Sequence, residues 1–298
     1  MPTRHFLAPV KLNGTTLGGI FSNKVGAVRD IFRRATDGNF HNTLQYDRKR
    51  SGAVEFKTVD IGAMLTALNG STDLPALKMN GSTGYQGYFF KAADGLPEIA
   101  SGTVHELATG LAGTVWMDSL DWSEGGDFEA SLRGIFGSSD GTVEPLAYTQ
   151  VVAPTIPTNT TAYDLTSATV ANGAAVDVDS ISLRFDPKLG VKRHPGSVLA
   201  RGVVSDGNPI DISCTVGIKD LSYLRSLTPA GVTTAFAFVL TKRANNGGLG
   251  SSTVTITLNG EWTLPEDGSA SVGQDGGASI LILPSYDGSN KPVTWAVA

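Results

Sequence analysis

One serine in the chain has the spacing of a hydrolase nucleophile. Ser139 lies in the segment GSSDG at residues 137–141, which matches the pattern Gly-x-Ser-x-Gly. Such a nucleophile sits on a sharp turn between a strand and a helix. The next residues, TVEP, do not start a helix, so we predict an Asp-Gly turn and no catalytic residue. A hydrolase that uses Ser139 is nevertheless one of three functional hypotheses, and the other two are given below.

Metal and cofactor sites have no signature in the sequence. The histidines are separated by 36, 64 and 89 positions, with no second ligand two to four residues away. No phosphate-binding loop or dinucleotide fingerprint occurs, because the run GGLG at 247–250 leads into a strand pattern rather than a helix. We therefore predict no metal, no cofactor and no enzymatic activity. The histidines are His5, His41, His105 and His194.

Acidic residues gather between positions 118 and 129. They lack the ligand order of an EF-hand, so two interpretations remain: a solvated strand end with its hairpin, or a charged wall that faces nucleic acid. A negative wall repels phosphates and keeps DNA from adhering. The residues of this acidic lumen or hairpin are Asp118, Asp121, Glu124 and Asp127.

The basic residues concentrate at the start of the chain. Residues 1–50 carry a net charge of +6, whereas the remainder carries −11. A basic arm binds nucleic acid or docks on the acidic surface of an identical neighbour. We favour the second, because no aromatic or glycine-rich nucleic-acid motif accompanies the charges. The predicted subunit-interface arm comprises Arg29, Arg33, Arg34, Arg48, Lys49 and Arg50.

The elements that position these residues follow an order that occurs twice. The run TLQYDRK at 43–49 precedes a strand at 54–58 and a helix after Asp60, and SLRFDPK at 182–188 precedes a strand at 210–218 and a helix after Asp220. The two runs are 139 positions apart, and Trp122 and Trp262 are 140 apart. This spacing predicts a whole-domain duplication rather than a short solenoid repeat.

The composition agrees with two β-rich domains. The chain has 298 residues, 36 of them glycine, and only 17% are charged, against about 25% in ordinary soluble domains. We predict a mainly β fold with two tandem related β-sandwich domains, 1–150 and 151–298, joined by an extended segment at 145–161 and each flanked by one short helix. Cys214 is expected to be buried, and no apolar run approaches the roughly 18 residues of a membrane span. A cytoplasm-like compartment is expected.

Alternation of apolar and polar residues predicts strands in both halves. A further helix is predicted over 24–35, where Val25, Val28 and Phe32 share one helical face. The predicted strands are 5–12, 41–47, 54–58, 85–91, 114–122 and 128–136, then 163–170, 178–185, 210–218, 233–241, 253–264, 278–283 and 293–297.

The halves differ most after their second strand. Four residues, 50–53, stand in the first half where the second has a long loop, 189–209. Long loops on compact β domains are usually functional or interfacial. The residues of interest in this loop are Lys192, Arg193, His194 and Arg201.

In this order of elements the chain resembles tail tube proteins of long-tailed, siphovirus-type phages, in the subgroup with two tube domains per polypeptide. The residues that carry the resemblance are the strand VDSISLRFD at 178–186, the preceding VANG at 170–173, the basic loop with Arg201-Gly202, and the strand and helix at 211–227. The similarity covers the chain from about residue 40 onward.

The resemblance implies a function. Tube domains of that family join edge to edge into rings, and the rings stack into a tube through which DNA passes. Three chains would complete a ring of six domains; a hexamer of chains is the alternative. The family's long loop contacts the next ring, which here concerns 189–209. Tape measure, tail tip and terminator proteins are implied partners, and the tail of the virion, assembled in the host cytoplasm, is the implied location.

A β-sandwich decoration protein of the virion, or a carbohydrate-binding module, is the alternative function. Neither class requires a catalytic motif, so the sequence does not separate it from a tube subunit. Tubes or rings in electron micrographs would support a tube subunit, whereas soluble monomers that bind glycans would support the alternative.

Overall fold

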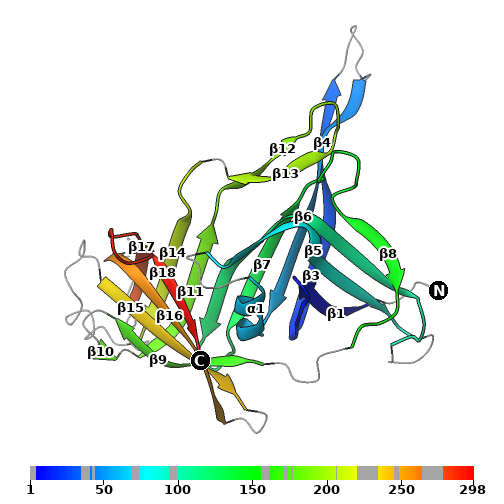
Figure 1. Cartoon of the computed structure of the whole chain (residues 1–298). Coiled ribbons are helices and arrows are strands. Elements are labelled where there is room, and N and C mark those ends of the chain that lie inside the picture. The colour runs from blue at the N-terminus through cyan, green and yellow to red at the C-terminus, as the bar shows by residue number, and fades with distance from the viewer. Residues whose placement is uncertain are drawn as a thin grey trace.

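Antiparallel strands form almost the whole of the computed structural model in Figure 1. It describes residues 5–34, 41, 44–68, 74–93, 99–155, 161–170, 174–175, 177–205, 207–219, 234–244, 248–263 and 278–298. The predicted mainly β fold is confirmed. Among the described residues, no helix has the length and apolar character to cross a membrane.

The elements of the first half are β1 (His5–Leu12), β2 (Thr15–Leu17), β3 (Ile20–Arg34), β4 (Leu44–Thr58), α1 (Ile61–Ala67), β5 (Ala76–Lys91), β6 (His105–Ser123), β7 (Glu129–Phe136) and β8 (Ala147–Val151). Those of the second half are β9 (Tyr163–Val170), β10 (Ala174–Ala175), β11 (Val178–Asp186), β12 (Leu189–Arg193), β13 (Ala200–Ser205), β14 (Asp211–Ile218), β15 (Thr234–Arg243), β16 (Leu249–Thr263), β17 (Ala278–Pro284) and β18 (Val293–Val297).

Strand pairing follows the same plan in both halves. In the first half β1 pairs with β2 and β5, β3 with β4, β4 with β7, and β6 with β5, β7 and β8. In the second, β9 pairs with β10 and β15, β11 with β14, β14 with β17, and β16 with β15, β17 and β18. Each of these pairings in the first half thus has a counterpart among the described strands of the second. The run at 182–188 lies largely in β11, whose counterpart is β3, whereas the run at 43–49 lies in β4, so the predicted alignment of these two runs is wrong. Descent from one duplicated unit stays a prediction.

Strand β6 joins the halves. One of its edges pairs with β5 up to Trp116 and then, from Ser119 to Ser123, with β11 of the second half. The opposite edge pairs with β8 and β7. A continuous sheet therefore crosses both halves in the order β3-β4-β7-β6-β11-β14-β17-β16. The predicted boundary near residue 150 falls inside β8, and the division into domains stays a prediction.

The core lies on one face of this sheet. In β7, Ala130, Leu132 and Phe136 are fully buried while Arg133 between them is exposed, as period-two alternation requires. At the junction, Leu120 of β6 is the register partner of Leu183 of β11, and both are buried. Buried residues from both halves form one connected cluster.

The helix predicted after Asp60 is confirmed as α1. The Asp60 carboxylate accepts the backbone N–H of Ala63 at 3.3 Å, which caps the first turn. The expected apolar stripe of the helix is buried against the core. Burial raises the pKa of Asp60 more than this bond lowers it. The helix predicted after Asp220 lies outside the described residues.

The helix predicted over 24–35 is wrong. This segment belongs to β3, which pairs with β4 from Ile20 to Arg34. The ladder satisfies the backbone of both strands, and the β-branched and aromatic residues of this segment suit a pleated surface. Two further predictions needed correction: the connection at 145–161 contains β8, and the loop at 189–209 contains the hairpin β12–β13. Cys214 is buried, as predicted.

The junction between the halves generates a first prediction. Replacing Leu183 by alanine should lower the free energy of unfolding by about 2–5 kcal/mol, because it opens a cavity beneath β6 and β11. Urea denaturation followed by tryptophan fluorescence measures this change. The control Leu283→Ala, at a side chain that is 47% exposed, should change it by no more than about 0.5 kcal/mol. Because the core is shared, we expect one transition; two transitions, with only one shifted, would contradict coupling of the halves.

Candidate functional site

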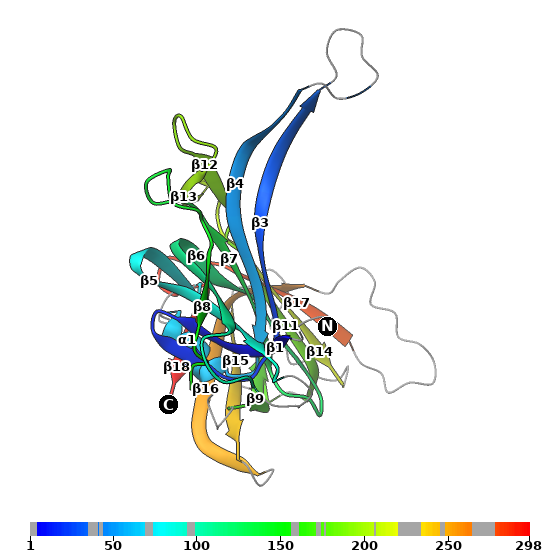
Figure 2. The same ribbon diagram turned by 90° about the vertical axis from the view of Figure 1, so that its right-hand side faces the viewer.

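A two-stranded arm projects from the sheet. Strand β7 pairs with β4 only from Gly52 to Thr58, so the preceding part of β4 and its partner β3 continue without neighbours in the main sheet. We call residues 28–34 and 44–51 the arm. Figures 1 and 2 show it rising beyond the other elements, with β12 and β13 beside its base.

The arm presents cations and apolar groups to solvent. Arg33 and Arg34 are exposed and make no ion pair with described residues. The guanidinium of Arg48 lies 4.2 Å from the centre of the Phe32 ring, which in turn lies 5.1 Å from the ring of Tyr46. Tyr46 is 48% exposed. Arginine with aromatic side chains is the composition typical of protein interfaces.

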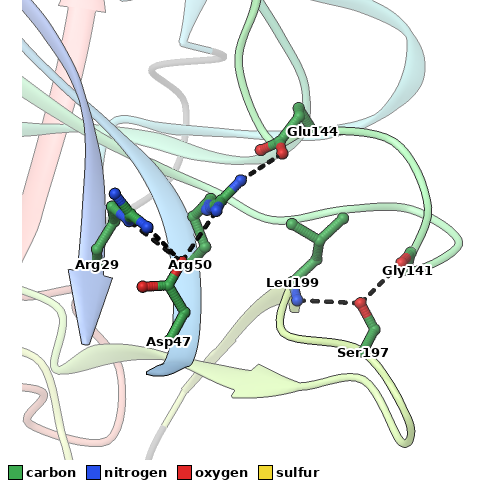
Figure 3. Close-up of polar contacts among 7 residues, drawn as sticks. All are labelled: Arg29, Asp47, Arg50, Gly141, Glu144, Ser197 and Leu199. Atoms are coloured by element: carbon green, nitrogen blue, oxygen red, sulfur yellow. Dashed lines mark hydrogen bonds and ion pairs between the residues drawn. The ribbon is translucent and has the colours of Figure 1, made fainter. Parts of the chain in front are cut away.

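Ion pairs fix the base of the arm (Figure 3). Asp47 accepts from Arg29 at 2.7 Å and from Arg50 at 2.9 Å, and Arg50 also contacts Glu144 at 2.6 Å. Hydrogen bonds from Arg29 and then Arg50 lower the pKa of Asp47, while the bond to Asp47 and the charge of Glu144 raise the pKa of Arg50. The network ties both arm strands to the loop between β7 and β8.

The second half supports the same base. The backbone N–H of Arg50 donates to the Val198 carbonyl at 2.8 Å. Nearby, the Ser197 hydroxyl donates to the Gly141 carbonyl at 2.8 Å and accepts the Leu199 N–H at 3.0 Å, as Figure 3 shows. The turn between β12 and β13 is therefore bonded both to the arm and to the loop after β7.

Side chains of the predicted loop also reach the arm. Arg193 donates to the Arg48 carbonyl at 3.3 Å, and Lys49 contacts the Val191 carbonyl at 3.5 Å. Lys192 is exposed. The structure thus brings together two sets of residues that the sequence suggested separately, the basic arm and the long loop. Their expected roles at subunit and ring interfaces stay predictions.

The remaining two residues of the loop lie apart from the arm strands. His194 Nε2 lies 3.0 Å from the Ser138 carbonyl oxygen, to which its N–H tautomer donates. Arg201 is exposed on β13. His194 therefore joins the loop to the end of β7, and Arg201 extends the cationic surface along β13.

Ser139 lies in the predicted Asp-Gly turn. The Asp140 carboxylate accepts the backbone N–H of Thr142 at 2.8 Å and of Val143 at 3.1 Å, and these bonds hold its pKa far below the ordinary value. Asp287 makes the same bonds to the two backbone groups that follow Gly288. No hydrogen bond joins Ser139 to His194 among the described residues.

Two of the predicted acidic residues lie within strand β6, and the other two lie in the turn after it. Asp118 approaches Arg133 at 3.4 Å in the middle of the sheet. The Asp121 carboxylate accepts hydrogen bonds from the hydroxyl groups of Ser119 and Ser182. The other two form ion pairs with the second half, Glu124 with Lys219 at 2.5 Å and Asp127 with Arg243 at 2.7 Å.

The turn between β6 and β7 lies at the opposite end of the sheet from the arm. The register shows this, because Thr58, at the end of β4 away from the arm, pairs with Ala130, while Gly52 near the arm pairs with Phe136. Glu124 and Asp127 belong to that turn. The described part of the chain therefore has a basic end and an acidic end.

The apolar part of the arm surface escaped the sequence argument. The helix assigned to 24–35 placed Val28 and Phe32 on a packing face, whereas Val28 is 54% exposed on the arm. A period-two strand pattern through Phe21 and Val25 would require an apolar residue at Asn23, so the segment gave no clear strand signal against the helical spacing.

Comparison with known proteins gives no family for this chain. No protein-family model matches it, and no curated protein matches it. Among the described residues, no group of three or more histidine, cysteine, aspartate or glutamate side chains is placed to hold a metal ion.

Arg50 is expected to control how firmly the arm is held. Arg50→Gln removes both ion pairs of its guanidinium, so backbone amides of 197–200 and 44–50 should exchange hydrogen faster at pH 7, measured by mass spectrometry. Arg34→Gln is the matched control and should change nothing, because this exposed arm residue forms no ion pair with a described carboxylate.

The acid response of the native chain tests the same network. Because the pKa of Asp47 is lowered in the folded chain, the stabilisation is present above the ordinary aspartate pKa of about 3.9 and is lost as pH falls through the lower folded value. If the amides of 44–50 and 197–200 exchange at equal rates in the native and Arg50→Gln chains at pH 7, the ion pairs of Asp47 and Arg50 do not hold the arm.

Proposed function

We propose that the chain is a structural virion protein, the subunit of a tail tube whose stacked rings enclose a lumen for DNA passage during genome ejection. The proposal rests first on the resemblance of its element order to two-domain tail tube proteins. The observation that carries it furthest is the eight-stranded sheet that runs without a break through both halves.

The two faces of this sheet suit a wall between a core and water. One face packs on the shared core. The other carries polar rows, such as the register partners Lys24, Glu55 and Arg133 on β3, β4 and β7. Farther along, Ser182 pairs with Asp121 and Thr215. A face of mixed charge supports a lumen in which DNA moves without binding, because net positive charge is what holds phosphates.

The link between the halves supplies a pattern for linking chains. The strands of the two halves can be aligned by their buried residues, so that Val54 of β4 corresponds to Cys214 of β14. Their register partners, Val25 of β3 and Leu183 of β11, then correspond as well. Residues 180–184 of β11 pair with β6, so their counterparts are 22–26 of β3. Among the described strands β3 pairs only with β4. An exposed edge of this kind pairs readily with another chain, and identical contacts around an axis close a ring.

The width of such a ring favours three chains. Strands about 4.8 Å apart and tilted by about 40° close a 24-stranded barrel with a backbone diameter of about 48 Å. Side chains project about 5 Å inward from each side of the wall and reduce the opening to about 38 Å. Two chains would leave about 22 Å, which barely clears a duplex whose grooves, about 8.5 and 7.5 Å deep, lie on either side of the base pairs. Six chains would give a diameter of about 96 Å by the same spacing.

Opposite ends of the subunit support stacking. Within the described residues, the arm and β12 carry eight basic side chains against Asp30 and Asp47, and the adjoining loop between β7 and β8 adds Asp140 and Glu144. The other end has six carboxylates against Lys219, Lys242 and Arg243. Complementary ends favour head-to-tail contacts, which extend without closing. The basic set is Arg29, Arg33, Arg34, Arg48, Lys49, Arg50, Lys192 and Arg193; the acidic set is Glu124, Asp127, Glu129, Asp164, Asp177 and Asp179.

Under this proposal the protein is located in the virion tail after assembly in the host cytoplasm. Its partners are further copies of itself, with tape measure and tail tip or terminator proteins at the lumen and ends. DNA passes without sequence-specific binding. The Ser139 geometry favours no enzymatic alternative.

Electron microscopy tests the proposal directly. Purified chain at high concentration should form rings or tubes in negative stain, with class averages that show threefold repetition. Hydrogen exchange of the same samples should show slower exchange in residues 20–27 after assembly, because a neighbour then covers this edge of β3. The edge strand β8, residues 147–151, serves as the internal control and should exchange at an unchanged rate. Isolated globules at every concentration tested would sink the proposal.

Charge reversal tests the stacking part. Lys192→Glu combined with Arg193→Glu should shorten tubes at least several-fold in micrographs while circular dichroism stays unchanged, because the substitutions place like charges against the acidic end of the next ring. Lys78→Glu, an exposed lysine on β5, is the matched control. Tubes of normal length in the double variant would argue against these contacts.

A further inference from the structure

A hollow of about 710 Å³ lies on the polar face of the sheet beneath the turn that follows β11. Its floor is formed by β3, β4, β7 and β6, and the residues of the turn form one wall. A second hollow of about 420 Å³ adjoins it and shares Trp116, Arg133, Asp186 and Pro187. The volume of the first hollow lies in the range of small-molecule sites in proteins.

Small side chains create the space. Gly26 of β3 and Ala53 of β4 are register partners and lie in the floor. A side chain at Gly26 would meet no atom within 4 Å of its Cβ. Apolar groups surround this gap, namely Ile135 from β7 and Pro187 and Leu189 from the turn. The hollow thus offers room and an apolar lining for a compact apolar group.

Trp116 gives the hollow a buried hydrogen-bond donor. The residue is only 6% exposed and lines both hollows. Its Nε1–H is buried and has no acceptor among the described residues. Because buried donors are almost always paired, the Nε1–H of Trp116 gains an acceptor if a ligand in the adjoining hollow displaces the atoms that cover it.

The groups around Trp116 specify the chemistry of that atom. Arg133, the register partner of Trp116, uses only its Nε toward Asp118, which leaves the rest of its guanidinium to donate. Lys24, at the other end of the row, makes no ion pair with described residues, and of the lining carboxylates Glu55 alone is similarly unpaired. Free donors therefore outnumber free acceptors.

We propose that this hollow binds a small amphipathic carboxylate, with its apolar body between Ile135, Pro187 and Leu189 and its carboxylate at Trp116 Nε1–H and Arg133. All residues that line the hollow belong to one chain, so the unassembled protein should bind the ligand. The bidentate geometry of a guanidinium suits a carboxylate, and the indole N–H supplies a further donor. The acceptor-rich head and the apolar body are both required by the lining, so neither part alone should bind well.

Nuclear magnetic resonance of the unassembled full-length chain tests the proposal. The probe is 3-phenylpropionate, and the signal is the indole N–H of Trp116, identified by its loss in Trp116→Phe. We expect a saturable shift of this signal alone among the four tryptophans. Propionate, which lacks the ring, and 3-phenylpropanol, which lacks the carboxylate, should each bind at least tenfold more weakly.

Variants separate the site from general surface binding. Gly26→Ile should abolish the shift by filling the hollow, and Arg133→Gln should weaken binding about tenfold while the other indole signals keep their positions. Gly190→Ile is the matched control, since a Cβ at Gly190 also meets nothing within 4 Å, and its affinity should stay within twofold. The proposal is overturned if the Trp116 signal does not saturate, if Gly26→Ile binds as well as the native chain, or if propionate alone binds equally.

Discussion

Backbone pairing between β6 and β11 is the interaction on which the rest of the structure depends. It converts two sets of strands into one sheet and places Leu120 and Leu183 side by side in a shared core. Strand β6 can do this because it is long enough to change partners along one edge, from β5 to β11. Ladder hydrogen bonds require little of the side chains, which explains why no sharp sequence motif marks the junction.

The same geometry explains the arm. In the first half β3 and β4 continue past the sheet as one hairpin, whereas in the second half the corresponding connection turns back as β12 and β13. Two unsupported strands are marginal in water. The arm is therefore held at its base by Asp47, Arg50 and the turn at Val198. An extended surface of cations and exposed aromatic rings follows from a short set of bonds at its root.

Particular elements show how far sequence reasoning reached. Strands in which polar and buried residues alternate, such as β7 and β14, were predicted closely, because each packs one face on the core. The helix over 24–35 was wrong, since helical and strand spacings overlap there and only pairing with β4 decides between them. Of the candidate site, the basic and loop residues were identified, but their contact was not, because Arg50 and Val198 are far apart in the chain.

The amino-acid sequence by itself determined the β-rich fold, the capped helix after Asp60, the turn around Asp140 and the basic character of the first 50 residues. These depend on local propensity, side chains that bond nearby backbone groups, and composition. Tertiary structure alone decided the joining of the halves, the arm and its support, and the hollow beside Trp116. Those features arise from contacts between residues distant in the chain, whose partners are chosen by the folded core rather than by neighbouring residues.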